Sequence, residues 1–469
     1  MNSGISRLQA WRGFKAGRSQ QAVLLPSIEA RLAALEVNMT ALQAENTALK
    51  NLLAGVTRNG SDIYIDGANL HIRDGSGDTG GPVNGLGNLI IGYNERRGYN
   101  SDNRTGSHNL ILGSRNNYMS YSGMILGNLN QISGPYASVS TGQSNKASSY
   151  YSSVSGGEGN TASSDYSSVS GGYENTASGL YSSVSGGYYN TANGDNSSVS
   201  GGQNNTASGN YTSVSGGSYN IANDAMIKTN ELDPFPPNRV SSAASISGGS
   251  YNTANGVYSS VSGGSRNTAS GSSSSVSGGQ NNRASGSYSS VSGGQSNTAS
   301  YWISPNGHRQ MSASSISGGY NNTASGSSST VSGGANNIAI GDAHSSTNSV
   351  SGGSSNIARG SSSSVSGGQN NIAIGLYSSV SGGINNAAAG SLYSDDAGFS
   401  VSGGYNNTAS GDRSSVSGGN NNTASGLYSS VSGGYENTAS GEASSVSGGI
   451  QRNATGIYDW VAGALFQDQ

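Results

Sequence analysis

The four histidines are the first residues to test for chemistry, because imidazole serves both as a metal ligand and as a general base. They stand at His71, His108, His308 and His344, at no spacing typical of a metal site. Serine occurs without the strand–turn–helix setting of a nucleophile elbow, and no helix follows the Gly-Gly pairs to make a phosphate loop. The chain has no cysteine, which excludes thiol catalysis and Cys-based zinc sites. We therefore expect no enzyme activity, no cofactor and no bound metal.

The composition of the 469-residue chain points to an ordered protein with a thin core. Only 32% of the residues are hydrophobic, while glycine alone accounts for 75. This excludes a series of ordinary domains with large cores. The net charge of −3 and the 26 tyrosines argue against disorder. We expect no nucleic-acid partner because there is no basic stripe, and no membrane span because there is no long apolar stretch. The N-terminus also lacks the apolar core of a secretory signal.

A 15-residue repeat explains this composition. Residues 166–179 read YSSVSGGYENTASG, and the repeat places Val154, Val169, Val184 and Val199 at intervals of 15. Looser copies (NLIIG, NLILG, GMILG) begin at residue 88, which gives about 22 turns over residues 88–452. Ser-Val-Ser and Thr-Ala-Ser alternate as strands do, and Gly-Gly and Asn suit corners. The repeat predicts an all-β solenoid with two short parallel strands in each turn.

Within a turn, the alternation predicts that Val and Ala point inward and that their Ser and Thr neighbours point outward. From Val139 to Val431, an asparagine follows each inward valine or isoleucine by six positions, as at Asn145, Asn160 and Asn175. Asparagine tolerates left-handed backbone, so we expect this column at a corner, with its amides stacked in a ladder.

A heptad pattern near the N-terminus predicts a short parallel coiled coil over residues 25–56. Pro26 suits the first turn of this helix, and two pairs, Arg31–Glu36 and Glu45–Lys50, fit charge pairing between chains. The alternative is one amphipathic helix packed on a globular domain. The expected oligomerisation residues are Leu25, Leu32, Met39, Asn46 and Leu53 at a positions, and Ile28, Leu35, Leu42, Leu49 and Val56 at d positions.

Three further segments complete the domain organisation. Residues 1–24 are basic, and form either a docking segment for a membrane surface or a particle base, or a loose tail. Residues 57–87 are expected to form two strands around Gly67 that connect to and cap the repeat. Residues 453–469 are expected to cap the last turn or to dock another protein, using Ile457, Trp460, Val461, Leu465 and Phe466.

Interruptions of the repeat are the best candidates for specific contacts, because insertions leave a solenoid as loops. They span Asn223–Arg239, Tyr301–Met311, Gly341–Asn348 and Gly390–Phe399. The alternative is that they are surface loops with no binding role. The candidate receptor contacts are Met226, Lys228, Phe235, Trp302, His308, Arg309, His344 and Tyr393.

The turn sequence resembles the head domain of trimeric autotransporter adhesins (the YadA-like, hemagglutinin-type repeat). NLIIG at Asn88–Gly92, NLILG at Asn109–Gly113 and GMILG at Gly123–Gly127 are nearest to that family's repeat. The resemblance implies a left-handed parallel β-roll and a homotrimer, including a trimeric coiled coil. The chain departs from the family in placing its coiled coil first and in showing neither a signal peptide nor a C-terminal membrane anchor.

These patterns together predict a structural extracellular fibre with an adhesive or receptor-binding role, located at a cell surface or attached to a particle. The expected partners are further copies of the chain and a host-cell, matrix or particle-base protein, with a glycan as a further candidate. One alternative is a tail fibre of a phage or contractile injection particle. Another is an ice-binding solenoid that uses Thr-x-Ser columns such as Thr161 and Ser163. The ligand and the export route stay open.

Overall fold

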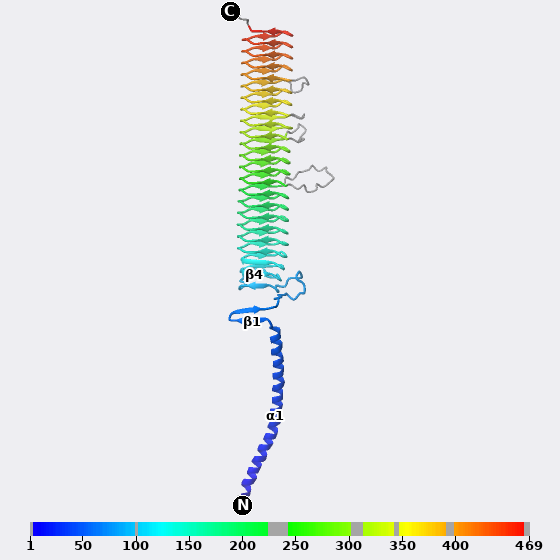
Figure 1. Ribbon diagram of the computed structural model, residues 1–469, viewed down its shortest axis with the longest axis vertical. Coiled ribbons are helices and arrows are strands. Elements are labelled where there is room, and N and C mark those ends of the chain that lie inside the picture. The colour runs from blue at the N-terminus through cyan, green and yellow to red at the C-terminus, as the bar shows by residue number, and fades with distance from the viewer. Residues whose placement is uncertain are drawn as a thin grey trace, which may run out of the picture. The chain divides into compact units, whose positions relative to one another are not determined.

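The computed structural model describes residues 3–98, 102–223, 243–301, 313–341, 347–390 and 398–463. In the helix, side chains are described at positions 7, 9, 11 and 12 and from Leu25 onward. The chain divides into two compact units, Met1–Ile72 and Arg73–Gln469. The first contains one helix and a hairpin, and the second is a rod of stacked turns (Figure 1).

Helix α1 spans Ser3–Leu52 and therefore begins well before the heptad pattern. The expectation that Pro26 opens the helix is wrong, because Pro26 lies inside α1. Proline has no N–H to donate within a helix, so it usually marks a helix start or a kink. The last two predicted heptad residues follow the helix: Leu53 lies in the turn after it, and Val56 begins strand β1.

The hairpin of the first unit differs from the predicted pair of strands around Gly67. Strand β1 (Val56–Asn59) pairs antiparallel with β2 (Asp62–Ile65), and no strand covers Leu70 or Ile72. The two-residue turn consists of Gly60 and Ser61, and Gly60 adopts a φ of 60°. A glycine at the first position of a two-residue turn is a hairpin signal, and Gly60 provides it here.

The second unit is a parallel β-solenoid of about 21 turns, which confirms the predicted architecture with one turn fewer. Each turn contributes one short strand to each of two parallel stacks, and corresponding residues of successive turns pair directly, for example Val154 with Val169. We call the stacks the valine sheet and the alanine sheet, after the inward residue of most strands.

The strands of the valine sheet are β3 (Leu89–Ile91), β4 (Leu110–Ser114), β6 (Met124–Asn128), β8 (Ser138–Val139), β10 (Ser153–Val154), β12 (Ser168–Val169), β14 (Ser183–Val184), β16 (Ser198–Val199), β18 (Ser213–Val214), β20 (Ser245–Ile246), β22 (Ser260–Val261), β24 (Ser275–Val276), β26 (Ser290–Val291), β28 (Ser315–Ile316), β30 (Thr330–Val331), β32 (Ser349–Val350), β34 (Ser364–Val365), β36 (Ser379–Val380), β38 (Ser400–Val401), β40 (Ser415–Val416), β42 (Ser430–Val431), β44 (Ser445–Val446) and β46 (Trp460–Val461). Those of the alanine sheet are β5 (Asn117–Tyr118), β7 (Gln131–Ile132), β9 (Lys146–Ala147), β11 (Thr161–Ala162), β13 (Thr176–Ala177), β15 (Thr191–Ala192), β17 (Thr206–Ala207), β19 (Ile221–Ala222), β21 (Thr253–Ala254), β23 (Thr268–Ala269), β25 (Arg283–Ala284), β27 (Thr298–Ser300), β29 (Thr323–Ser325), β31 (Ile338–Ile340), β33 (Ile357–Ala358), β35 (Ile372–Ala373), β37 (Ala387–Ala388), β39 (Thr408–Ala409), β41 (Thr423–Ala424), β43 (Thr438–Ala439) and β45 (Asn453–Ala454).

The interior of the rod is a stack of small side chains. Val169 and Ala177 are buried and their flanking residues Ser168 and Thr176 are partly exposed, which confirms the predicted alternation. A third inward column was not predicted: the residue two before the inward valine, a serine in most turns as at Ser167, is also buried. It faces inward for the same reason as the valine, because residues two apart on a strand share a face.

The asparagine column lies in the connection from a valine strand to the next alanine strand, which confirms its predicted place at a corner. Its predicted left-handed backbone is wrong, and its side chains point into the rod. Asn190 is fully buried, and its Oδ1 accepts a hydrogen bond from the N–H of Asn205 in the next turn at 2.9 Å. Its Nδ2 donates to the carbonyls of Gly186 at 2.8 Å and Gly202 at 3.0 Å. The left-handed residue is the one before it, Tyr189, with a φ of 55°. A buried amide needs partners for each of its polar atoms, and this position supplies them.

This asparagine ladder continues without a break from Asn116 to the N–H of Arg452. It bridges each interruption of the repeat: the N–H of Asn252, for example, donates to Asn220 Oδ1 at 3.0 Å. The predicted ladder therefore exists, but its main link joins a backbone N–H to a side-chain oxygen rather than two amides.

Candidate functional site

The four interruptions of the repeat all fall at one corner of the coil. Each lies between an alanine-sheet strand and the next valine-sheet strand, after β19, β27, β31 and β37. The strands on either side keep their register, as the pairs Val214–Ile246 and Ala222–Ala254 show for the longest gap. We call this connection corner 1, and the connection from a valine strand to the next alanine strand corner 2.

The candidate receptor residues themselves lie outside the described residues. These are Met226, Lys228, Phe235, Trp302, His308, Arg309, His344 and Tyr393. The structure therefore fixes where the chain leaves and re-enters the coil, but assigns no contact to these side chains.

Two residues assigned to interruptions belong to the rod instead. Asn348 and Phe399 are buried in the inward serine column, two residues before Val350 and Val401. A Cβ added at Gly390 would lie 2.0 Å from the Phe399 ring, so glycine there leaves the space that the ring fills. Phe399 is thus a core residue, and the fourth interruption ends before it.

A ladder of exposed tyrosines lines corner 1 over four successive turns. Tyr136, Tyr151, Tyr166 and Tyr181 occupy the left-handed position three residues before the inward valine, with φ between 52° and 57°. Successive ring centroids lie 4.8, 5.5 and 4.8 Å apart, with their planes within 18° of parallel. Left-handed backbone costs a non-glycine residue about 1–2 kcal/mol, and stacked rings offset part of that cost. We call these four residues the tyrosine ladder. Their 15-residue spacing is visible in the sequence, but the stacking of their rings was not predicted.

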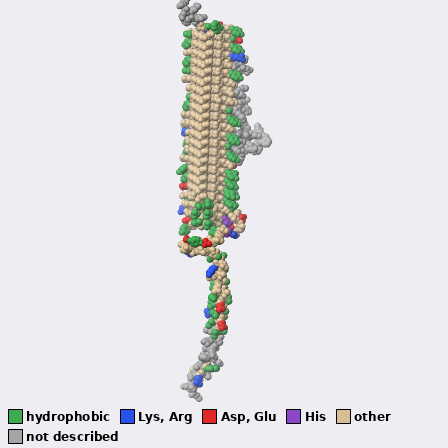
Figure 2. Space-filling view, in the orientation of Figure 1, with side chains coloured by type: hydrophobic (Ala, Val, Ile, Leu, Met, Phe, Trp, Pro, Cys, Tyr) green, Lys and Arg blue, Asp and Glu red, His purple; other side chains and the backbone are tan. Residues whose placement is uncertain are grey.

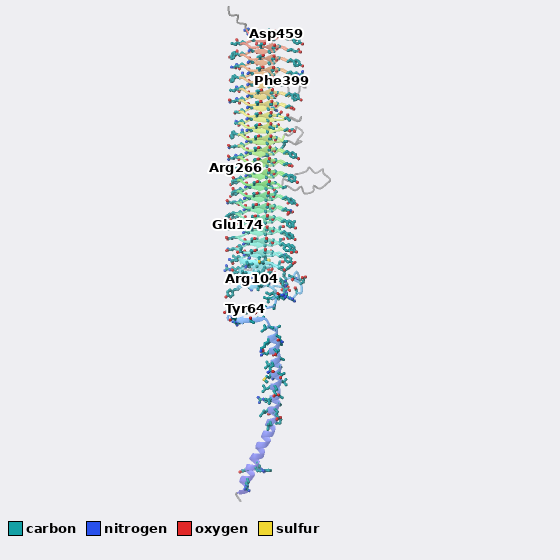
Figure 3. All side chains as sticks on the ribbon, in the orientation of Figure 1. Tyr64, Arg104, Glu174, Arg266, Phe399 and Asp459 are labelled. Carbon is teal, nitrogen blue, oxygen red and sulfur yellow. The ribbon has the colours of Figure 1, made fainter. Side chains whose placement is uncertain are left out.

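Corner 2 carries a second set of exposed polar and aromatic residues. Glu174 and Arg266 occupy its left-handed position, and Figure 3 shows both side chains on the same edge of the rod. A hydrogen bond to Glu174 and the negative charge of that carboxylate raise the pKa of Tyr173 to about 12. The guanidinium of Arg266 lies 5.6 Å from the centre of the Tyr251 ring. Figure 2 shows the resulting stripes of hydrophobic side chains, tyrosine included, along both edges.

In the first turn of the rod, His108 Nε2 lies 3.6 Å from Asp74 Oδ1 and accepts a hydrogen bond from the Asp74 backbone N–H at 3.3 Å. Hydrogen bonds from the Ser76 hydroxyl and backbone N–H lower the pKa of Asp74 below its usual value of 3.8. His71 is exposed. Across the part of the chain that the structure describes, no three His, Asp or Glu side chains gather as metal ligands would.

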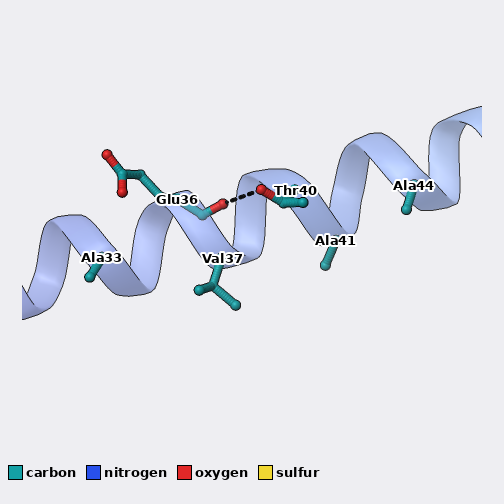
Figure 4. Close-up of a pocket in the computed structure, with 6 residues that line it drawn as sticks. All are labelled: Ala33, Glu36, Val37, Thr40, Ala41 and Ala44. Carbon is teal, nitrogen blue, oxygen red and sulfur yellow. Dashed lines mark hydrogen bonds between the residues drawn. The ribbon is translucent and has the colours of Figure 1, made fainter.

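All of the predicted oligomerisation residues are exposed in a single chain. Leu35 and Leu42, for example, are more than 60% exposed. A shallow groove on the opposite face of α1 is lined mainly by small side chains, and Thr40 Oγ1 donates there to the Glu36 carbonyl at 2.8 Å (Figure 4). Among the described residues, no helix has the length and apolar character needed to cross a membrane.

The outward threonine column of the alanine sheet is regular only in part. Thr161, Thr176 and Thr191 stack in register, but Ile221 and Arg283 occupy the same position further along. At the end of the rod, Val461 packs against the core while Trp460 stays largely exposed. Leu465 and Phe466 lie outside the described residues.

The chain matches no model of a known protein family, and none of the curated proteins compared with it matches.

Proposed function

We propose that this protein is a structural fibre of the cell surface or extracellular space with an adhesive role. In this proposal, α1 joins three copies as a parallel coiled coil, and each solenoid winds as a left-handed β-roll. The observation that carries the proposal is that the repeat and its interruptions occupy different places in the rod. The repeated asparagine side chains form hydrogen bonds within and between turns, whereas the four interruptions of the repeat all leave at corner 1. The resemblance to trimeric autotransporter heads supports the same function.

The helix supports self-association for an energetic reason. An isolated helix gains little stability from its backbone, and most helices are stabilised by packing of an apolar face. In α1 the apolar heptad residues from Leu25 to Leu49 lie exposed. Partner helices would bury this row, and the Arg31–Glu36 and Glu45–Lys50 pairs would favour a parallel arrangement.

The mass of the protein in solution tests this association. We expect light scattering to give about three times the chain mass of 46.9 kDa. The double variant Leu35→Lys/Leu42→Lys places two charges in the buried seam and should reduce the mass to that of one chain. The matched control is Val37→Lys/Ala44→Lys, on the opposite face, which should keep the native mass. A native protein of single-chain mass would contradict the proposal.

Replacing one interruption tests the adhesive role. An uninterrupted turn has two residues, such as Gly179-Leu180, where the longest interruption has residues 224–242. We expect a variant with Gly-Leu in place of 224–242 to keep its circular dichroism spectrum and to lose about tenfold or more in binding to cells or matrix proteins.

The matched control for that replacement shortens the chain by a similar length elsewhere. Deleting residues 257–271 removes one whole turn and leaves the register intact, because Val261 and Val276 are equivalent positions. Binding should survive this deletion. Unchanged binding after the replacement of 224–242 would remove that segment from the proposal.

A further inference from the structure

The outer face of the valine sheet changes character along the rod. In its first three strands, β3, β4 and β6, the residues on either side of the inward isoleucine column are apolar. From the fourth turn, the same two columns contain serine, at Ser138 and Ser140 and then at Ser153 and Ser155. We call the apolar set the basal patch, and its members are Leu89, Ile91, Leu110, Leu112, Met124 and Leu126.

The basal patch is open to solvent in the single chain. Leu89, Ile91 and Leu112 are exposed to 42%, 52% and 38%, and the other three side chains are partly exposed. Figure 2 shows hydrophobic side chains gathered at the N-terminal end of the rod, with a face of small and polar residues beyond them. A continuous apolar patch on a soluble protein marks an interaction surface.

We propose that a second copy of this chain covers the basal patch, and that this contact between copies ends at the fourth turn. None of the six side chains is charged, so two such patches meet without burying an unpaired charge. The inference rests on the proposed function in one respect: it assumes that α1 joins the copies. Residues 54–88 then tether each patch close to its counterparts, which raises their effective concentration.

The extent of the contact follows from the change of residue type. Serine columns offer little apolar area to bury, and burying their hydroxyls without a hydrogen-bond partner costs free energy. The rods are therefore joined at their first three turns and separate beyond them, so that corner 1 of each copy is accessible along most of its length.

Single-cysteine variants of the full chain test this arrangement cleanly, because the native chain has no cysteine. Leu112→Cys places a thiol in the basal patch, and Ser170→Cys places one in the same column further along the rod. Met39→Cys reports on the helix seam. After mild oxidation, we expect covalent dimers from Met39→Cys and Leu112→Cys on a non-reducing gel. The dimer fraction of Ser170→Cys should be roughly tenfold lower. Circular dichroism of each variant shows that the rod is intact.

The outcomes separate this inference from the proposed function. Dimers from Met39→Cys without dimers from Leu112→Cys leave the helix association standing and overturn the inference, including the case in which another part of the same chain covers the patch. No dimers from either variant overturn both. Equal dimer fractions from Leu112→Cys and Ser170→Cys overturn the limit at the fourth turn, because the copies would then run side by side along the rod.

Discussion

Replacing Asn190 with alanine is expected to destabilise its part of the rod by about 2–5 kcal/mol. The substitution removes the Oδ1 that accepts from the Asn205 N–H, and the Nδ2 that donates to the carbonyls of Gly186 and Gly202. The site is fully buried, so water cannot easily replace these partners. A buried polar group left without a partner costs about 1–3 kcal/mol, and more than one is affected here.

Hydrogen exchange is the appropriate measurement, because a long stack of turns does not unfold in one step. We expect the backbone amides of Asn205 and its neighbours to exchange faster in the variant than in the native protein. The increase in rate should correspond to the loss of about 2–5 kcal/mol in stability. Asn193→Ala is the matched control: the same substitution in the same turn, at an exposed side chain. Equal exchange in the two variants would mean that the asparagine ladder contributes little to stability.

Replacing Gly187 with alanine is expected to disrupt the stack about as strongly, by about 2–5 kcal/mol. Gly187 adopts a φ of 90°, and an added Cβ would lie 2.2 Å from the carbonyl oxygen of Gly202 and 2.5 Å from Asn190 Nδ2. The nearest obstacle is the backbone of the next turn, which cannot move without breaking the hydrogen bonds between turns. We expect a lower thermal midpoint and faster proteolysis near this turn.

The neighbouring residue provides the control for this prediction. A Cβ added at Gly186 would meet nothing within 4 Å, and its backbone is outside the left-handed region. Gly186→Ala should therefore change stability by no more than about 0.5–1 kcal/mol, with a slight gain from the less flexible unfolded chain. A Gly187→Ala variant as stable as Gly186→Ala would contradict the close stacking of the turns.

The repeat predicted the solenoid because every turn repeats the same choice of residue at the same position. Val169 and Ala177 alternate with polar neighbours, and that pattern alone fixes which side chains face inward. The backbone conformation of the asparagine column was predicted wrongly for a physical reason: left-handed tolerance is a local property, whereas the partners of a buried amide include groups of adjacent turns. The helix start was predicted wrongly for a similar reason. Proline prefers the first turn of a helix, but this local preference is overridden at Pro26 within a 50-residue helix.

The sequence predicted where the repeat is interrupted, but it did not predict the side-chain contacts at the corners. The interruptions stand out from the repeat, and their positions between an alanine and the next valine already imply a shared corner. The tyrosine ladder needed the structure, because the stacking of Tyr151 on Tyr136 depends on side-chain geometry that spacing does not fix. The basal patch was hidden by the same inward–outward alternation, because NLIIG and NLILG contain both inward and outward apolar residues.

The unbroken asparagine ladder has a consequence for how such a molecule can change over evolutionary time. Every turn presents the same row of donors and acceptors above and below, so duplicating or losing a whole turn creates no new kind of junction. The stabilisation from stacking grows in proportion to the number of turns, while the two ends stay the same. The reach of the rod is therefore adjustable in steps of one turn, independently of what its ends or corners recognise.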